Sequence, residues 1–228
     1  MSLSSLSTPT RGRGTSWVAQ QLRDMIIRGQ LSPGQRISER AMSGLIEGLS
    51  RTPLREAFKV LEAEGLITIQ PNRGAVVTAL AMEEVNAAIE VLIGLESMAA
   101  EPACANITKE HIQDIQALHA QMEQAHQQAD LMAYFDLNQR IHAHIVAAAG
   151  NPVLLRIYLA ECARIRRYRY AGNLQQARWS EAVEEHRSML QALQQRSGAL
   201  LRELLRAHHA RGWTVSKAIV QQASHQAG

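Results

Sequence analysis

The sequence predicts a mainly α protein made of two parts, a small unit with one β-hairpin and a larger helical bundle. Apolar residues recur at intervals of three and four along most of the 228 residues, and only 6 prolines interrupt the chain. This spacing is typical of amphipathic helices. A Pro-Asn-Arg-Gly turn between two short apolar runs indicates a single hairpin over residues 66–79. Beyond Leu80 the pattern becomes purely helical.

The first part begins with three predicted helices. One covers residues 16–28 and ends at Gly29, a second follows the N-cap residue Ser38, and a third runs from about Ser50 to Gly65. Each has one apolar face, formed in turn by Val18, Leu22, Met25 and Ile26, by Ala41, Met42, Leu45 and Ile46, and by Leu54, Ala57, Phe58 and Leu61.

A β-hairpin follows the third helix. Its predicted strands are Leu66–Gln70 and Ala75–Ala79, joined by the turn at 71–74. Three helices with a two-stranded wing define a winged helix-turn-helix over residues 16–80. Residues 1–15 are rich in Ser, Thr, Gly and Arg, and we expect them to form a flexible tail.

The second part is predicted to hold six helices. They cover residues 82–103, 108–128, 131–149, 153–171, 176–196 and 198–222. Thr108 and Asp130 are expected N-caps, and Gly150-Asn151-Pro152 marks a break. Because the connections are short, neighbouring helices should be antiparallel, which indicates an antiparallel α-helical bundle over residues 81–222.

Basic residues favour the first part. Residues 1–80 hold 10 Lys and Arg against 6 Asp and Glu, a net charge of +4, whereas residues 81–228 hold 14 against 15, a net charge of −1. Arg51 and Arg55 lie one helical turn apart at the start of the third helix, and Arg73 lies at the hairpin tip. Arginines so placed can reach guanine edges or phosphates in a major groove. The sequence therefore predicts binding to double-stranded DNA.

The composition argues against a secreted or membrane protein. The two cysteines, Cys104 and Cys162, show no CxxC spacing and are expected to be buried, reduced thiols. No apolar run approaches the roughly 20 residues that span a bilayer, and the N-terminus lacks the apolar core of a signal peptide. We therefore expect a cytoplasmic protein with no membrane partner.

Three predicted helices each place one histidine on an apolar stripe. His142 lies on the 131–149 helix with Asn138 one turn earlier, His186 lies on the next helix, and His208 on the last. A buried polar group without a partner costs about 1–3 kcal/mol. Three imidazoles can avoid that cost by binding one divalent metal. Alternatively, each makes its own local hydrogen bond.

The neighbouring polar residues are expected to lie off these stripes. His144, Arg187 and His209 are predicted to point elsewhere, and no carboxylate lies on the inward stripes beside the four polar residues. Arg164 and its neighbouring arginines are expected to form a charged face, although Arg164 could reach the bundle interior. Trp179 shares a stripe with His186 and is expected in the core or at a pocket.

Two segments resemble the GntR family of bacterial transcription regulators, namely LRDMIIRGQLSPGQRISER and SRTPLREAFKVLEAEGLITIQPNRGAVV. The helical part resembles the FCD effector domain of the FadR-like branch through IHAHIVAAAGNPVL, EEHRSMLQAL and a histidine 22 residues after His186. The resemblance covers roughly Ser16 to Gln222. It implies a homodimer that binds a short palindromic operator and is regulated by a small metabolite, often a carboxylate beside a metal.

The resemblance also implies residue roles. The family's DNA-contact positions correspond to Arg40, Arg51, Thr52, Arg55, Arg73 and Gly74. Its metal-ligand positions correspond to Asn138, His142, His186 and His208, the four residues that the helical spacing selects. The expected cofactor is therefore a divalent metal such as Zn, Ni or Mn.

Two positions depart from the family pattern. Many members carry Asp where this chain has Asn138, and the amide is the poorer metal ligand. The arginine that often binds the effector carboxylate aligns with Leu92, so the anchor is expected elsewhere, at Arg164, with Trp179 lining the pocket. The predicted function is a ligand-responsive transcriptional regulator, expected to be a repressor. The alternatives are a regulator that senses the metal ion itself and, more remotely, a metal-dependent hydrolase.

Overall fold

The chain divides into two compact units that meet in sequence between Leu80 and Ala81. The computed structural model describes residues 14–38, 40–42, 51–71 and 73–226. Each unit has its own core and is described by itself.

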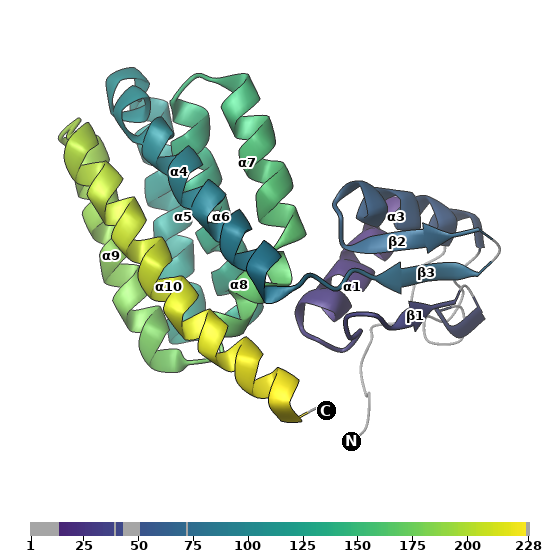
Figure 1. Ribbon diagram of the computed structural model, residues 1–228. Coiled ribbons are helices and arrows are strands. Elements are labelled where there is room, and N and C mark those ends of the chain that lie inside the picture. The colour runs from purple at the N-terminus through teal and green to yellow at the C-terminus, as the bar shows by residue number, and fades with distance from the viewer. Residues whose placement is uncertain (1–13, 39, 43–50, 72, 227–228) are drawn as a thin grey trace. The chain divides into compact units, whose positions relative to one another are not determined.

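The first unit combines helices with a small antiparallel sheet (Figure 1). Its described elements are α1 (Thr15–Ile27), β1 (Arg36–Ile37), α3 (Arg51–Ala63), β2 (Ile67–Gln70) and β3 (Gly74–Val77). The strand order is β1-β3-β2. In the hairpin, Ile67 pairs with Val77 and Gln70 with Gly74. The sequence missed β1, because two residues are too short for an alternating pattern to be visible.

One apolar core holds this unit together. Helices α1 and α3 contact each other and direct their apolar faces to the same cluster as the inward side chains of the sheet. Its most deeply buried members are Val18, Leu22, Ile26, Ile37, Leu54, Ala57, Leu61, Ala75 and Val77. Burying such side chains is worth about 1.5–3 kcal/mol each for the larger ones, so this packing fixes the orientation of α3.

The predicted second helix is described only at its start. Residues 40–42 are helical, and the Ser38 hydroxyl accepts a hydrogen bond from the Ala41 amide at 3.0 Å. The predicted N-cap at Ser38 is therefore confirmed. The rest of this helix lies outside the described residues, as does Ser50, the predicted start of the third helix.

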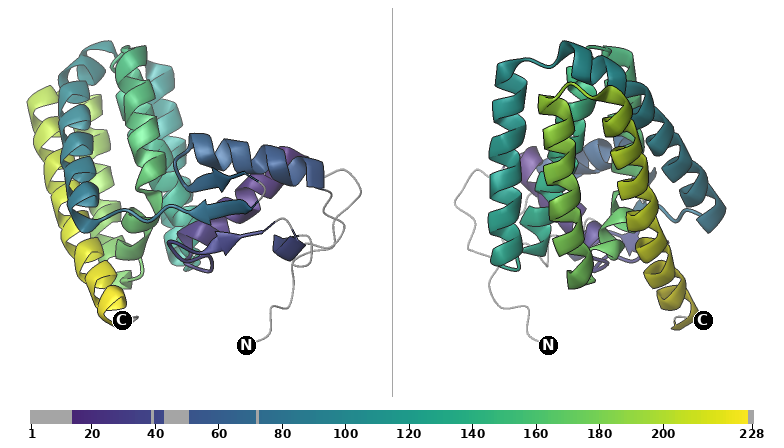
Figure 2. Two further views of the ribbon diagram at one scale, coloured as in Figure 1. Left: turned by 45° about the vertical axis from the view of Figure 1, so that its right-hand side comes forward. Right: turned by 90° about the vertical axis from the view of Figure 1, so that its left-hand side faces the viewer.

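The second unit is entirely helical in its described part. Its helices are α4 (Met82–Asn106), α5 (Lys109–Gln127), α6 (Leu131–Ala148), α7 (Pro152–Arg164), α8 (Arg166–Gly172), α9 (Gln176–Gln194) and α10 (Gly198–Gln226). Helix α10 packs along α4, α8 and α9, and α6 packs against α4, α5 and α7. Figures 1 and 2 show the long helices running side by side as a bundle.

The predicted helix boundaries in this unit are largely confirmed. Thr108 and Asp130 cap α5 and α6 through side-chain oxygens, and Asn151 caps α7. The predicted helix over 153–171 is instead two helices, because Ile165 leaves helical geometry with φ −105° and ψ 11°. Its side chain is fully buried, and the bend directs α8 against α10.

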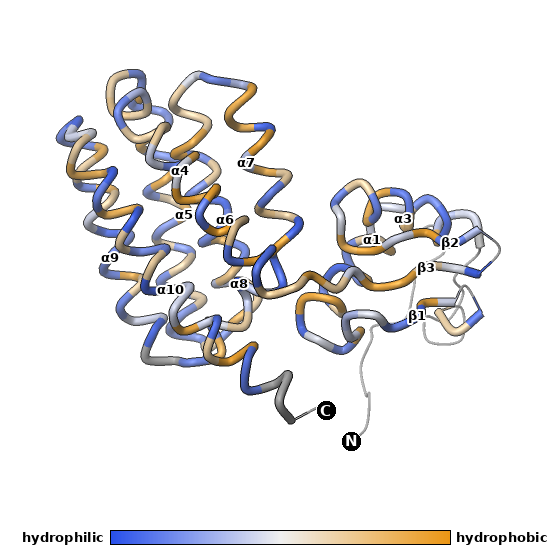
Figure 3. Tube along the Cα trace, viewed as in Figure 1, coloured by the Kyte–Doolittle hydropathy of each residue, from blue (hydrophilic) through white to orange (hydrophobic). Residues whose placement is uncertain are grey.

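Hydrophobic and hydrophilic stretches recur along the clearly visible helices of the bundle (Figure 3). The hydrophobic positions supply the core, as expected for amphipathic helices. Among the described residues, no helix is both long and apolar enough to cross a membrane.

Candidate functional site

The exposed face of α3 is the first candidate site. On α3, the side chains of Leu54, Ala57 and Phe58 are buried on the face that packs against the core. Thr52 and Arg55 are exposed on the same helix. Arg51 is the first residue of α3, but its side chain lies outside the described part of the structure. The apolar face of α3 is thus packed against the core, and its polar side chains point outward. DNA contact by α3 requires this arrangement.

The other predicted DNA-contact residues are also accessible. Arg40 and Arg73 are exposed, and the Arg73 amide donates to the Gln70 carbonyl oxygen at 3.0 Å to close the hairpin turn. Within this unit, the predicted arginines therefore lie at the start of the second helix and at the wing. DNA contact by these residues stays a prediction.

Gly74 has a structural role at the wing. Its φ is +82°, and a Cβ atom built there would lie 2.3 Å from the Ile37 carbonyl oxygen. Only glycine tolerates both the backbone conformation and this close approach of β1. The family resemblance implied that Gly74 contacts DNA, and the geometry supplies a sufficient reason for the glycine without such a contact.

The second candidate site is a histidine cluster inside the helical unit. His142 on α6, His186 on α9 and His208 on α10 are buried, and one ring nitrogen from each lies within 4.8 Å of the others. The ring centroids are 4.9 Å apart for all three pairs. The structure therefore brings together the three histidines that the helical spacing selected.

Several buried polar atoms at this cluster have no hydrogen-bond partner among the described residues. They are Asn138 Oδ1, His142 Nε2, and both ring nitrogens of His186. Asn138 lies one turn before His142 on α6 and is also buried. Unpartnered buried groups are costly, and a nitrogen-rich set with one oxygen suits a divalent transition metal. The residues present therefore fit such an ion.

Two carboxylates lie within hydrogen-bond distance of two of the histidine rings. Glu96 Oε2 lies 3.0 Å from His142 Nδ1, and Glu185 Oε2 lies 2.6 Å from His208 Nδ1. Glu96 is completely buried on α4. The expectation that no carboxylate lies beside the polar stripes is thus wrong, because Glu96 occupies an inward position on a helix that contributes no histidine.

His209 is also part of the cluster, contrary to the sequence prediction. Its Nε2 lies 2.7 Å from Glu96 Oε2, and its ring centroid is 4.8 Å from that of His142. His208 and His209 are both buried. Adjacent residues on a helix point about 100° apart, and α10 passes through the bundle so that both directions face inward.

Burial and charge control the protonation of these groups. Burial, reinforced by the neighbouring imidazoles, holds the pKa of His186 and of His208 well below the usual value, so both rings are neutral and carry a free lone pair. For Glu96, burial alone would raise the pKa, but His142 and His209 outweigh it and hold the pKa well below the usual range. Glu96 is therefore an ionised hydrogen-bond acceptor.

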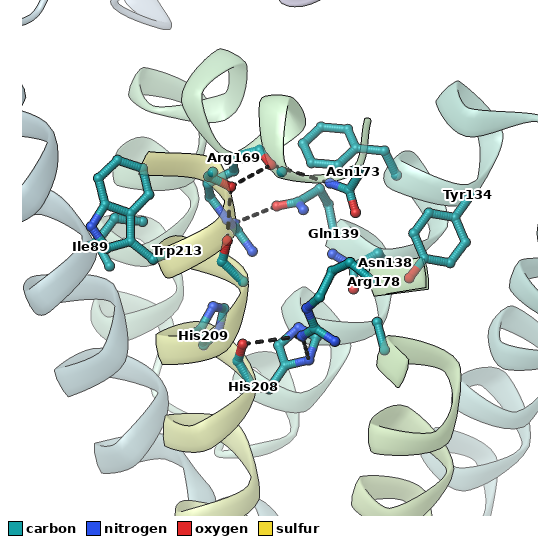
Figure 4. Close-up of a pocket in the computed structure, with 15 residues that line it drawn as sticks. Ile89, Tyr134, Asn138, Gln139, Arg169, Asn173, Arg178, His208, His209 and Trp213 are labelled. Carbon is teal, nitrogen blue, oxygen red and sulfur yellow. Dashed lines mark hydrogen bonds between the residues drawn. The ribbon is translucent and has the colours of Figure 1, made fainter. Parts of the chain in front are cut away.

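A cavity of about 50 Å³ opens beside the histidines (Figure 4). Asn138, His208 and His209 are among its lining residues, and Arg169 and Arg178 supply its permanent positive charges. The other lining residues are Ile89, Tyr134, Phe135, Gln139, Gly172, Asn173, Ala182, Gly212, Trp213 and Ser216. No Asp or Glu is among these lining residues, so the cavity favours an anion.

The two arginines are buried but differently partnered. Arg169 Nη1 donates to Gln139 Oε1 at 2.5 Å. Arg178 Nη2 donates to Glu185 Oε2 at 2.6 Å, while its Nη1 is buried without a hydrogen bond and lies 3.7 Å from Glu181. Arg178 therefore retains donor capacity for a ligand.

The predicted effector-binding residues do not line this cavity. Arg164 forms ion pairs with Glu84 and Glu161 and is absent from the lining, because α7 ends before the cavity and α8 carries the arginine that enters it. Trp179 lies behind the lining, where it stacks on Tyr134 with ring centroids 5.1 Å apart. The residue spacing of the predicted 153–171 helix could not show which arginine lines the cavity, because the bend at Ile165 changes which arginine faces inward.

Family models match both units. Residues 15–77 match the family described as bacterial regulatory proteins, gntR family, and residues 87–211 match the FCD domain. Two curated relatives have similar lengths. The HTH-type transcriptional regulator YdhC of Bacillus subtilis is 27% identical over 194 residues, covering 82% of this chain and 84% of that protein. The HTH-type transcriptional repressor RspR of Escherichia coli is 26% identical over 187 residues, covering 82% of each.

A solved structure shares the fold. Escherichia coli McbR/YncC superimposes with a TM-score of 0.76 at 21% sequence identity, over 90% of this chain and 97% of that one. At this identity the match shows the architecture and carries no information on ligand or operator.

Proposed function

Because the chain belongs to the GntR family of bacterial regulatory proteins and carries an FCD domain, we propose that it is a repressor whose helical unit binds a small organic acid beside a divalent metal. The chain is a DNA-binding transcriptional regulator and not an enzyme. Its relatives are transcriptional regulators as well. The FCD domain is a ligand-binding domain. The remote alternative of a metal-dependent hydrolase is therefore set aside.

The unpartnered atoms of Asn138, His142 and His186 carry the metal proposal. Asn138, His142, His186 and His208 would hold the ion, and Zn, Ni and Mn are the metals expected for three imidazoles and an oxygen. When bound, the ion supplies a Lewis-acidic charge to which a ligand oxygen can bind. The protein's own part is to present neutral rings from three helices and to exclude water around them.

The metal proposal is tested by the double variant His142→Ala with His186→Ala. Wild-type protein purified from cells should carry close to one metal ion per chain, measured by mass spectrometry of the elements. The double variant should carry none, while circular dichroism and operator binding show that the first unit remains folded. Full metal occupancy in the double variant would disprove the site.

The cavity arginines support the organic acid. Leu92, which the family resemblance aligns with an anion-binding arginine, is buried and apolar. Arg169 on α8 and Arg178 on α9 take over its role in the proposal, because both are buried at the cavity and a guanidinium pairs with a carboxylate through two parallel hydrogen bonds. The cavity's small volume limits the effector to a few non-hydrogen atoms.

The small cavity also keeps a second function open, in which the metal ion itself is the effector. An operator selected from random duplexes serves for both tests. Chelator alone should leave operator affinity nearly unchanged if an organic acid is sensed, and should change it strongly if the ion is sensed.

A panel of small carboxylic acids should raise the melting temperature of wild type and of Arg164→Gln, but not of Arg178→Gln. Equal responses in both variants would remove Arg178 from the effector site.

A further inference from the structure

Glu96 connects four helices at one buried carboxylate. Its Oε1 accepts a hydrogen bond from the Tyr158 hydroxyl on α7 at 2.6 Å. Its Oε2 lies 2.7 Å from His209 Nε2 on α10 and 3.0 Å from His142 Nδ1 on α6. The Glu96 side chain has no exposed surface. Both oxygens are therefore used within the protein, and the carboxylate has no contact with water.

These distances indicate hydrogen bonds and not a second metal site. Glu96, His142 and His209 have the residue types that hold an ion. However, two ligand atoms on one tetrahedral zinc, each about 2.0–2.1 Å from it, lie roughly 3.3 Å apart. The observed separations of 2.7 and 3.0 Å are shorter and match ordinary N–H···O distances. The carboxylate thus accepts hydrogens from both rings.

The hydrogen bond fixes which nitrogen of His142 carries the proton. Glu96 Oε2 lies within hydrogen-bond distance of ring nitrogens from two histidines, and its other oxygen accepts from Tyr158. A carboxylate shared in this way acts as the acceptor, so Nδ1 is the protonated nitrogen of His142. The lone pair then lies on Nε2, the buried atom that has no partner. A ring protonated on both nitrogens would instead leave a buried Nε2–H without an acceptor. The contact with Glu96 therefore leaves the lone pair of Nε2 free, on a ring whose centroid lies 4.9 Å from those of His186 and His208.

We propose that Glu96 is a positioning residue for the metal site, which locks the tautomer and ring orientation of His142 while Tyr158 and His209 hold the carboxylate in place. This inference rests on the proposed function. Helix α4 supplies no metal ligand, yet through Glu96 it takes part in the site. Residues of this kind commonly change metal affinity 10–100-fold when removed.

The variant Glu96→Gln tests the proposal, with Glu90→Gln as its matched control because Glu90 is exposed on the same helix. Zinc affinity is measured by competition with a chelator, and the ligand field is measured from the visible absorption of the Co²⁺ form. Glu96→Gln should weaken zinc binding 10–100-fold and alter the Co²⁺ spectrum. Tyr158→Phe should have a smaller effect, because it leaves Oε2 and its two rings in place. Glu90→Gln should match wild type.

The outcomes separate this inference from the proposed function. Wild-type protein that binds neither ion would disprove the metal site itself. Wild type that binds, with unchanged affinity and Co²⁺ spectrum in Glu96→Gln, would overturn the positioning role alone. A merely structural Glu96 would lower the melting temperature of the metal-free protein without altering the Co²⁺ spectrum.

A measurement on metal-free wild type covers the case in which Glu96→Gln does not fold. Long-range ¹H–¹⁵N spectra of protein labelled at histidine report the tautomer of each ring, and the loss of signals in His142→Gln assigns His142. We expect the Nδ1–H form. The Nε2–H form at His142 would overturn the proposal.

Discussion

Arg55 shows how one residue's surroundings decide its expected role. It is exposed on α3, and the buried residues Leu54 and Phe58 beside it fix the helix to the core. Arg51→Ala and Arg55→Ala should each weaken specific operator binding by about 1–3 kcal/mol, the range for a bidentate contact with guanine. Fluorescence anisotropy with a selected operator measures the loss.

Lys59→Ala is the control for this prediction. Lys59 is exposed one turn beyond Arg55 and pairs with Glu56 at 2.8 Å. Its loss removes the same charge and should weaken binding to all duplexes about equally. If Arg51→Ala and Arg55→Ala also weaken specific and nonspecific binding equally, α3 does not contact base edges.

The histidine cluster shows which buried polar residues can be predicted from their spacing in the sequence. Spacing alone identified His142, His186 and His208, because each is the one histidine on an otherwise largely apolar stripe. Glu96 has the same signal, since it lies four residues after Leu92 on the buried stripe of α4, and the same test applied to this helix would have found it. His209 could not be found in this way, because its neighbour His208 already occupies the inward direction of α10.

At the scale of elements, helix existence was predictable and bends were not. Cap residues such as Thr108 and Asp130 mark helix starts by their own chemistry, so those boundaries were confirmed. The break at Ile165 has no proline or glycine to signal it. Packing decides it, because Gly172 lets α8 approach α10 so closely that an added Cβ would lie 2.1 Å from Ser216 Oγ. Contacts between elements distant in sequence leave no local signal.

The wing illustrates how two elements depend on one residue. Gly74→Ala places a Cβ atom against the Ile37 carbonyl oxygen and forces a strained φ of +82°. The substitution should lower the free energy of unfolding of the first unit by more than the roughly 1 kcal/mol that a left-handed alanine costs. Chemical denaturation followed by circular dichroism measures the change.

Gly29→Ala separates the two causes. Gly29 has a similar φ of +75°, but nothing lies within 4 Å of the added Cβ. Gly29→Ala should therefore lower the free energy of unfolding only by the cost of the strained backbone conformation. Equal destabilisation by the two substitutions would mean that β1 moves aside, and that the close approach at Gly74 contributes no stability.

At the scale of the whole molecule, the palindromic operator that the family resemblance implies would require two copies of the chain. One recognition helix covers one half-site, so a twofold dimer reads both. Exposed apolar side chains lie on two helices that contact each other, α4 and α7. They include Val91 and Met98, seven residues apart on α4, and Val153 and Ile157, four residues apart on α7. We call these four side chains the α4–α7 face and expect the dimer interface to include them, since apolar side chains left exposed on neighbouring helices can mark an interaction surface.

Met98→Glu tests the α4–α7 face. Met98 is 66% exposed, the largest value among these side chains, so the substitution costs the isolated chain little but would bury a charge in the dimer. Sedimentation should change from dimer to monomer, and operator binding should weaken because each chain then binds its half-site separately. Leu174→Glu is the control, since Leu174 is 59% exposed between α8 and α9 and should leave the dimer intact. A Met98→Glu protein that still sediments as a dimer would place the interface on another face of the helical unit.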